Sequence, residues 1–456
     1  MGLVTSRLDQ PRSARLCERL YETCRQSISG VAPQLYASVS GGPAGLAEHA
    51  VCGGTDEVST NAANKGGLED VVAGTSAISS VDGFAPKLAY RGIDVHDLAA
   101  HSTFEETAYL LWHGHLPTTF GLSVLEDRLS CCRNLPFGII RMIVEFPQAS
   151  EPMMVLRTLV SALEMYDPGG PEHHHDVDLS RAILLTSRVP TIIAYHHRAR
   201  LKLELVEPRH DLGMAANFLY MLTGDVPAER AARILDQCLI LHADHELNAS
   251  TFAARVAAAT LSDLYSSTTA AVGTLSGPLH GRANERVMEM LERIGEVSRV
   301  EEYLQGLLAK GGKVPGFGHR VYRKRDPRVD ELASFSEALG REAGELKWYE
   351  MTRAIEEFML EEKGIYANVD LYSASVYHVL GIPTDLFTPV FAISRMVGWT
   401  AHILEQYANN RLIRPRAEYI GLHGVPYTPI DRRPEPETPV RTPDCLTSAI
   451  APPRQP

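Results

Sequence analysis

The segment Val314–Arg328 carries the densest set of residue types that could do chemistry. His319 directly follows a Gly-x-Gly pair, Gly316 and Gly318, and a run of arginine and lysine residues with one acid comes after it. Glycine lets the backbone approach a ligand closely, and arginine suits carboxylate or phosphate oxygens. A solvated basic surface would not require these glycines. The segment therefore predicts an anion-binding loop that contains a titratable imidazole.

Two further histidine segments lie earlier in the chain. His242 and His245 are three residues apart, a spacing that would place both on one face of a helix. This pattern favours anion binding, with a polar network inside a helical core or a metal site as alternatives. Glycine and proline flank His280, so we expect it on a turn between helices, where catalytic groups often lie. An ordinary surface histidine is the alternative.

A carboxylate completes the set. Asp370 lies between Val369 and Leu371 in the sequence Asn-Val-Asp-Leu. Apolar surroundings disfavour the charged form of a carboxyl and raise its pKa, as a general base near neutrality requires. A structural helix cap explains the same residue equally well.

The elements that must position these residues show mainly helical periodicity. Apolar residues recur at helical spacing over 287–294, with Asn284 as the expected N-cap, and also over 329–339 and 354–359. Another helix is expected to open at Asp225. The main strand candidate is a hairpin, Ala77–Phe84 returning through Leu88–Tyr90, with its turn at Asp82-Gly83. The sequence lacks a repeated strand–helix rhythm and the common nucleotide-binding, serine-hydrolase and zinc-protease motifs. The pattern predicts an all-α fold with one short hairpin.

Composition limits the classes of function. The formal net charge is −12 and the pI about 5.8, which argues against a surface built for nucleic acid or anionic membrane. Seven cysteines without a C-x-x-C spacing suggest neither a disulfide framework nor a cysteine zinc site. We expect a cytoplasmic protein with no membrane span. Residues 1–66, rich in Ser, Gly and Ala, and the Pro-rich residues 425–456 are expected to be flexible extensions.

Taken in order, these motifs resemble the citrate synthase family from about residue 67 to 424, most closely the dimeric type of Gram-positive bacteria. Further matching segments lie at Gly67–Ser76, Tyr90–Val95, Asp211–Asn217, Phe391–Arg395 and Arg414-Pro-Arg416. The resemblance implies a large helical domain (67–275 and 376–424) and a smaller helical domain (276–375) that close over a cleft. It also implies a homodimer.

The resemblance further implies a role for each candidate residue. His280 would stabilise the enol of acetyl-CoA, Asp370 would remove the methyl proton, and His319 would protonate the oxaloacetate carbonyl. The implied oxaloacetate ligands are His245, Arg328, Arg395 and, from the partner subunit, Arg414. The implied coenzyme A contacts are Val314, Gly316, Gly318, Arg323 and Lys324.

The implied activity is that of citrate synthase, an acyltransferase at the first step of the tricarboxylic acid cycle. Acetyl-CoA and oxaloacetate are the expected substrates, and no metal or other cofactor is expected. The near alternative is 2-methylcitrate synthase, which uses propionyl-CoA. A non-catalytic acyl-CoA-binding regulator on the same fold and a metallohydrolase built on His242 and His245 are more remote alternatives.

Overall fold

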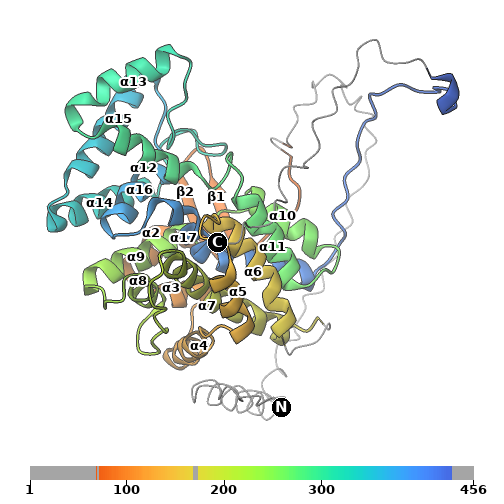
Figure 1. The fold of residues 1–456 in the computed structure, drawn as a ribbon, viewed down its shortest axis with the longest axis horizontal. Coiled ribbons are helices and arrows are strands. Elements are labelled where there is room, and N and C mark those ends of the chain that lie inside the picture. Colours follow the sequence, from red (N-terminus) through yellow and green to blue (C-terminus); the bar gives the residue numbers. More distant parts are fainter. Residues whose placement is uncertain (1–67, 69–70, 168–172, 434–456) are drawn as a thin grey trace, which may run out of the picture. The chain divides into compact units, whose positions relative to one another are not determined.

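A computed structural model describes residues 68, 71–167 and 173–433 of the chain. They form sixteen α-helices and one small sheet (Figure 1). The helices are α2 (Val95–His101), α3 (Phe104–His113), α4 (Thr119–Cys131), α5 (Phe137–Glu145), α6 (Pro152–Ala162), α7 (His175–Arg200), α8 (Met214–Thr223), α9 (Glu229–His242), α10 (Ala249–Ala258), α11 (Leu264–Leu275), α12 (Ala283–Ile294), α13 (Val300–Ala309), α14 (Val329–Ala343), α15 (Lys347–Lys363), α16 (Val369–Val379) and α17 (Phe387–Ala408).

The sheet confirms the predicted hairpin and extends it. Strands β1 (Ser79–Asp82) and β2 (Lys87–Tyr90) pair antiparallel, and β3 (Ile93–Asp94) adds a short third strand to β2. The side chain of Asp82 accepts hydrogen bonds from the backbone of Phe84 (2.8 Å) and Ala85 (3.0 Å), which holds the turn. The third strand was not predicted because two residues are too short for a period-2 pattern.

Helices α7 and α17 lie at the centre of the main compact unit, which ends at Ile413. Both are buried around most of their circumference, and they pack against each other and against α6, α9, α10 and α11. A helix that is buried on all sides needs its polar side chains to be paired internally. The buried polar residues of α17 meet this requirement, since hydrogen bonds are made by Arg395, Thr400, His402 and Gln406.

Helices α12 to α16 form a second group within the same unit. They pack mainly on one another, with α16 against α12, α14 and α15, and α13 against α15. Figure 1 shows them together on the left as teal and blue ribbons, with α13 and α15 farthest from α7. The apolar faces predicted for 287–294, 329–339 and 354–359 are buried between these helices.

Two predicted helix starts were wrong. The helix expected to open at Asp225 begins at Glu229, and α12 begins at Ala283, so that Asn284 is inside the first turn instead of capping it. Asn284 is completely buried, and its side chain accepts a hydrogen bond from the backbone of Glu285. Tertiary packing thus overrides the usual preference of asparagine for a cap.

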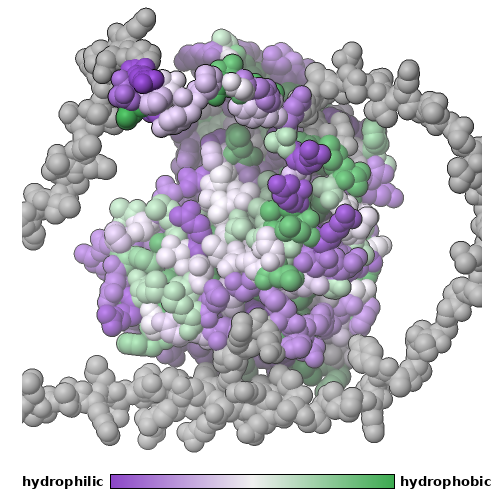
Figure 2. Space-filling view, turned by 90° about the vertical axis from the view of Figure 1, so that its right-hand side faces the viewer, coloured by the Kyte–Doolittle hydropathy of each residue, from purple (hydrophilic) through white to green (hydrophobic). Residues whose placement is uncertain are grey.

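The chain divides into two compact units, of which the second begins at Arg414. Its described residues are exposed and include only one short 3₁₀ turn, Ile430–Arg432. Figure 2 shows one face of the molecule, where hydrophilic residues are interspersed with small groups of hydrophobic ones. In the part of the chain that the structure describes, no helix combines the length and apolarity needed to cross a bilayer. The predicted extension 1–66 lies outside the described residues, as does most of 425–456.

Candidate active site

The loop that follows α9 carries His245. Because α9 ends at His242, His242 and His245 do not share a helix face, and that prediction was wrong. His242 is completely buried and its Nδ1 lies 2.7 Å from the carbonyl oxygen of Cys238, whereas His245 contacts the hydroxyl of Tyr322 through Nε2 at 3.3 Å. Burial and the nearby Arg328 hold the pKa of His245 well below its usual value. His245 is therefore a neutral imidazole at neutral pH.

His280 lies on the turn between α11 and α12, as expected. Its Nε2 is 2.8 Å from the hydroxyl of Ser250, which is buried at the start of α10. Burial, with a smaller contribution from Arg395, lowers the pKa of His280 to about 4. A neutral imidazole carries one N–H, which can donate a hydrogen bond to a developing oxyanion.

His319 has a defined tautomer. Its Nδ1 accepts hydrogen bonds from the backbone nitrogens of Val321 (3.0 Å) and Tyr322 (3.1 Å). Backbone nitrogens can only donate, so the proton of the neutral ring is on Nε2. Burial and Arg328 lower the pKa of His319 to about 4. The ring centroids of His319 and His245 are 5.1 Å apart, so the two imidazoles are in an edge-to-face contact.

Asp370 is at the start of α16 but does not cap it. Asn368 is the N-cap, and its side chain accepts from the backbone nitrogen of Asp370 at 3.0 Å. Among the described residues, none donates a hydrogen bond to the Asp370 carboxylate. Burial raises the pKa of Asp370 to about 7, although Arg328 and Arg395 oppose the shift. The cap interpretation was therefore wrong, and the carboxyl is suited to accept a proton near neutral pH.

A short antiparallel contact joins the loops of His319 and Asp370. Phe317 bridges Ala367, the nitrogen of Gly318 donates to Tyr366 oxygen at 3.0 Å, and the amide of Asn368 donates to Gly318 oxygen at 2.9 Å. Gly316 has φ +84°, and an added Cβ would lie 3.0 Å from side chains of the surrounding core. Glycine is needed here for its conformation and its small size. These contacts fix the loops of His319 and Asp370 relative to each other.

Two buried arginines surround these groups. Arg395, 2% exposed, donates from Nε to the carbonyl of His242 at 2.8 Å, and burial lowers its pKa to about 10. Its charge lowers the pKa values of His245, His280 and Asp370, with burial as the larger cause of each shift. Arg328, also 2% exposed, is paired with Asp326 through Nη2 at 2.7 Å and Nε at 2.9 Å. A buried cation can hold an anionic substrate strongly.

The cations of residues 320–328 fall into two groups, those paired with carboxylates and those exposed to solvent. Arg328 is buried against Asp326, and Arg325 pairs with Glu356 at 2.7 Å and 3.0 Å. The remaining cations, Arg320, Arg323 and Lys324, are exposed and available to a ligand. Val314, the first residue of the segment, is buried.

The backbone nitrogen of Arg323 donates to Gly83 at 3.0 Å, so the β1–β2 turn supports this part of the loop. Gly83 itself has no room for a side chain, because an added Cβ would lie 2.3 Å from the carbonyl oxygen of Val321.

Two further predictions concern Arg414 as a substrate ligand and His242 and His245 as metal ligands. Arg414 belongs to the second compact unit, so it is not placed relative to the site. Within the described residues, no group of three or more His, Cys, Asp or Glu is arranged to hold a metal ion. His242 is turned into the apolar core, with Phe391 at 5.0 Å between ring centroids.

Helices and loops thus gather a carboxyl with a raised pKa, three neutral imidazoles and two buried arginines. This is the composition of an acid–base enzyme for anionic substrates. Residues 67–416 match the family described as "Citrate synthase, C-terminal domain". The chain belongs to the citrate synthase family, and it is an acyltransferase.

The similarity extends over nearly the full length of known relatives. The chain is 50% identical over 374 residues to a citrate synthase of Haloferax volcanii, covering 81% of this chain and 99% of that protein. It is 41% identical to a 2-methylcitrate synthase of Shewanella oneidensis, with 80% and 98% covered. A citrate synthase from Thermoplasma acidophilum, solved as a ternary complex with carboxymethyl coenzyme A and oxaloacetate, has a TM-score of 0.76 at 33% identity, with 80% of this chain and 98% of that chain covered. The predicted family and helical fold are confirmed.

Several residues of the site were not assigned roles from the sequence. Tyr322 contacts His245, Ser250 contacts His280, and Asn368 holds the loops of His319 and Asp370 together. Asn368 is two residues from Asp370 and Ser250 is five residues from His245, but a lone Asn or Ser is too common to indicate a role. Only the folded structure brings Ser250 to His280, thirty residues away.

Proposed function

We propose that this chain condenses acetyl-CoA with oxaloacetate and water to give citrate and CoA. The observation that carries the proposal is the pairing of Asp370, with a pKa of about 7, and His319, with its proton on Nε2, on two loops that are hydrogen-bonded to each other. Members of this family act on a CoA thioester without a metal cofactor. The donor set in this chain supports the same chemistry because it supplies a base, an acid and cations.

The proposed reaction starts with proton removal from the acetyl methyl group. Asp370 takes the proton, and the electron pair moves toward the thioester oxygen, where a hydrogen bond from His280 stabilises the enol. The enol carbon then attacks the ketone carbon of oxaloacetate. His319 gives its Nε2 proton to the ketone oxygen, and a citryl-CoA thioester results. Water then attacks this thioester, the carbon–sulfur bond breaks, and CoA leaves as a thiol.

Substrate binding is assigned to the cations. His245, Arg328 and Arg395 would hold the oxaloacetate carboxylates, because both arginines are buried and charged next to the site. Val314, Gly316, Gly318, Arg323 and Lys324 would contact coenzyme A. The exposed Arg323 and Lys324 are suited to its phosphates.

The proposal also covers the division into domains, the oligomeric state and the cellular location. The grouping of α12–α16 supports a small domain over 276–375 that closes on a large domain over 67–275 and 376–424. Closure would keep water from the acyl group before condensation. The neighbouring elements α5, α6 and the turn after α6 expose Phe137, Met154 and Met165, which supports a homodimer, with Arg414 reaching the partner's site. The cysteine pattern supports a cytoplasmic location.

Release of CoA thiol tests the proposal directly. The purified chain is incubated with acetyl-CoA or propionyl-CoA, each with and without oxaloacetate. Oxaloacetate-dependent release, faster with acetyl-CoA, is expected. One methylene is typically worth about 1–3 kcal/mol of discrimination, so slower turnover of propionyl-CoA is compatible. A preference for propionyl-CoA would reassign the enzyme to 2-methylcitrate synthesis, and no release from either would support the non-catalytic alternative.

A further inference from the structure

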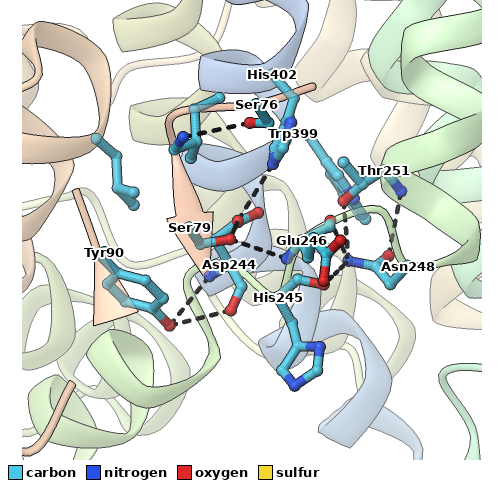
Figure 3. Close-up of polar contacts among 12 residues, drawn as sticks. Ser76, Ser79, Tyr90, Asp244, His245, Glu246, Asn248, Thr251, Trp399 and His402 are labelled. Carbon is cyan, nitrogen blue, oxygen red and sulfur yellow. Dashed lines mark hydrogen bonds and ion pairs between the residues drawn. The ribbon is translucent and has the colours of Figure 1, made fainter. Parts of the chain in front are cut away.

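Helix α17 carries buried polar side chains beyond Arg395 that no step of the proposed reaction uses. Trp399 and His402 are completely buried, and Gln406 is 5% exposed. Their spacing of three and four residues places them on one side of the helix, the side that faces the loop before α10. Figure 3 shows Trp399 and His402 directed toward this loop, where Asp244, His245 and Asn248 lie. This side of α17 therefore contacts the residues that support the site histidines.

Ser250 is the meeting point between Trp399 and His280. The indole Nε1 of Trp399 lies 3.1 Å from the Ser250 hydroxyl oxygen, and His280 Nε2 lies 2.8 Å from the same atom. The third neighbour is Oδ1 of Asn248, at 2.8 Å. A hydroxyl has one proton and two lone pairs. Because an indole nitrogen can only donate, Trp399 occupies one lone pair, and one proton and one lone pair remain for the other two neighbours.

The orientation of the Asn248 amide is fixed independently. Its Oδ1 accepts from the backbone nitrogen of Thr251 at 3.1 Å, which makes Asn248 the N-cap of α10. Its Nδ2 lies 3.3 Å from the carbonyl oxygen of His245, an atom that can only accept. Oδ1 is therefore an acceptor. The Ser250 proton can point to Asn248 or to His280, but not toward Trp399, which presents a hydrogen there.

These two orientations give His280 two different tautomers. When Ser250 donates to Asn248, its free lone pair accepts a proton from His280 Nε2. When Ser250 instead donates to Nε2, the proton of the neutral ring must be on Nδ1. Among the described residues, none bonds to Nδ1 of His280, so Nδ1 is the nitrogen available to a substrate. Only the second orientation makes it a donor.

We propose that Trp399 is a positioning residue for His280, because its indole N–H confines the Ser250 hydroxyl to these two orientations. A donor on one lone pair also polarises the hydroxyl and strengthens the bond that it donates. By excluding a third orientation, in which the hydroxyl would point toward position 399 and could only accept from Nε2, Trp399 raises the share of the His280 tautomer that can stabilise an oxyanion. The inference rests on the proposed function of His280, although the tautomer itself is a property of the free protein.

The test compares two tryptophans that make the same kind of bond. Trp399→Phe removes the N–H and keeps most of the ring volume. Trp112→Phe is the matched control, because the indole of Trp112 donates at 2.9 Å to the buried hydroxyl of Thr400 on the same helix. We expect both variants to lose a similar, small amount of thermal stability. Only Trp399→Phe should lower kcat, by about tenfold, with KM for oxaloacetate changed less than twofold.

A double-mutant cycle separates a route through Ser250 from general loosening of the core. In a Ser250→Ala background, Trp399→Phe should cause no further loss of kcat, since the hydroxyl that it orients is gone. Additive losses, or an equal loss in Trp112→Phe, would overturn the proposal. If Trp399→Phe does not fold, the single Ser250→Ala variant remains informative, because an unchanged kcat there would also overturn it.

Nitrogen NMR of histidine-labelled protein tests the tautomer without any turnover. The His280 resonances are assigned by their loss in His280→Gln. Trp399→Phe should shift the balance between the Nδ1–H and Nε2–H signals of His280, and Trp112→Phe should not. This result would stand even if the wild-type chain released no CoA, so a failed reaction and a failed positioning role are distinguishable. Identical His280 signals in wild type and Trp399→Phe would contradict the proposal.

Discussion

The imidazole Nε2 of His402 lies 3.2 Å from Oδ2 of Asp244, and both side chains are completely buried (Figure 3). Nδ1 of His402 faces a guanidinium nitrogen of Arg255 at 3.1 Å. Arginine can only donate, so His402 is neutral and its proton is on Nε2, directed at Asp244. The same carboxyl oxygen accepts from Ser79 of β1 at 2.5 Å. Asp244 thus joins α17, the sheet and the loop that carries His245.

Replacing Asp244 should disturb oxaloacetate binding. In Asp244→Asn, the amide cannot accept from both Ser79 and His402 with the strength of a carboxylate, and the adjacent His245 loses its support. We expect KM for oxaloacetate to rise roughly tenfold and the free energy of unfolding to fall by about 1–3 kcal/mol. Steady-state kinetics and urea unfolding measure the two effects.

The matched control is Asp236→Asn. Asp236 is also buried, and it accepts from the backbone of Phe104 at the start of α3, with no contact to the site histidines. This variant should lose stability while KM stays unchanged. A normal KM in Asp244→Asn, together with lost stability, would show that Asp244 serves the fold alone.

Asp370 links catalysis to the pH dependence of stability. Burial raises its pKa in the folded chain to about 7, above the value of 3.8 for an exposed aspartate. The folded protein therefore holds this proton where the unfolded chain has released it, and the stabilising contribution is lost as pH rises from about 4 through 7. Turnover needs the ionised base, so kcat/KM should fall as pH drops below about 7.

Asp370→Asn should uncouple these two effects. The amide cannot take a proton, so turnover should drop by about a hundredfold or more. At pH 8 the variant should be at least as stable as the wild type, because it no longer buries a charge. Thermal unfolding at pH 5 and pH 8 measures this, and the advantage should be smaller at the lower pH. A variant that is less stable at both values would contradict a raised pKa.

The turn of the hairpin provides a test of the contact between the sheet and the His319 loop. In Gly83→Ala, the new Cβ would meet the carbonyl oxygen of Val321 at 2.3 Å, so the loop must move. Arg323, whose nitrogen is bonded to Gly83, would move with it. We expect KM for acetyl-CoA to rise severalfold. Gly74→Ala is the control, since nothing lies within 4 Å of its Cβ position. Equal kinetics in the two variants would mean that the turn does not support the loop.

The sequence predicted those elements for which the spacing of residue types is set by the geometry of a helix or a turn. Helical periodicity predicted α12, α14 and α15, and the Asp82-Gly83 turn predicted the hairpin. The partners of the site histidines were not predictable in this way. Trp399 is 149 residues from Ser250, and a buried tryptophan in a helix is normally a core residue. Its bond depends on how α17 packs on α10, which only the folded chain defines.

The sequence of residues 320–328 does not indicate which of its cations are free to bind a ligand. The sequence shows a row of cations, whereas the fold pairs Arg325 with Glu356 and leaves Arg323 exposed. If coenzyme A binds here, Arg323→Ala should raise KM for acetyl-CoA about tenfold, and the effect should shrink as salt increases because exposed charges are screened. Arg325→Ala removes the same charge from the same segment. It should leave KM within twofold and lower the free energy of unfolding by about 1 kcal/mol, since its guanidinium already serves the contact with Glu356. Equal increases of KM in both variants would show that the total charge of the segment attracts the substrate. An effect of Arg323→Ala alone would show that the fold selects which cation binds.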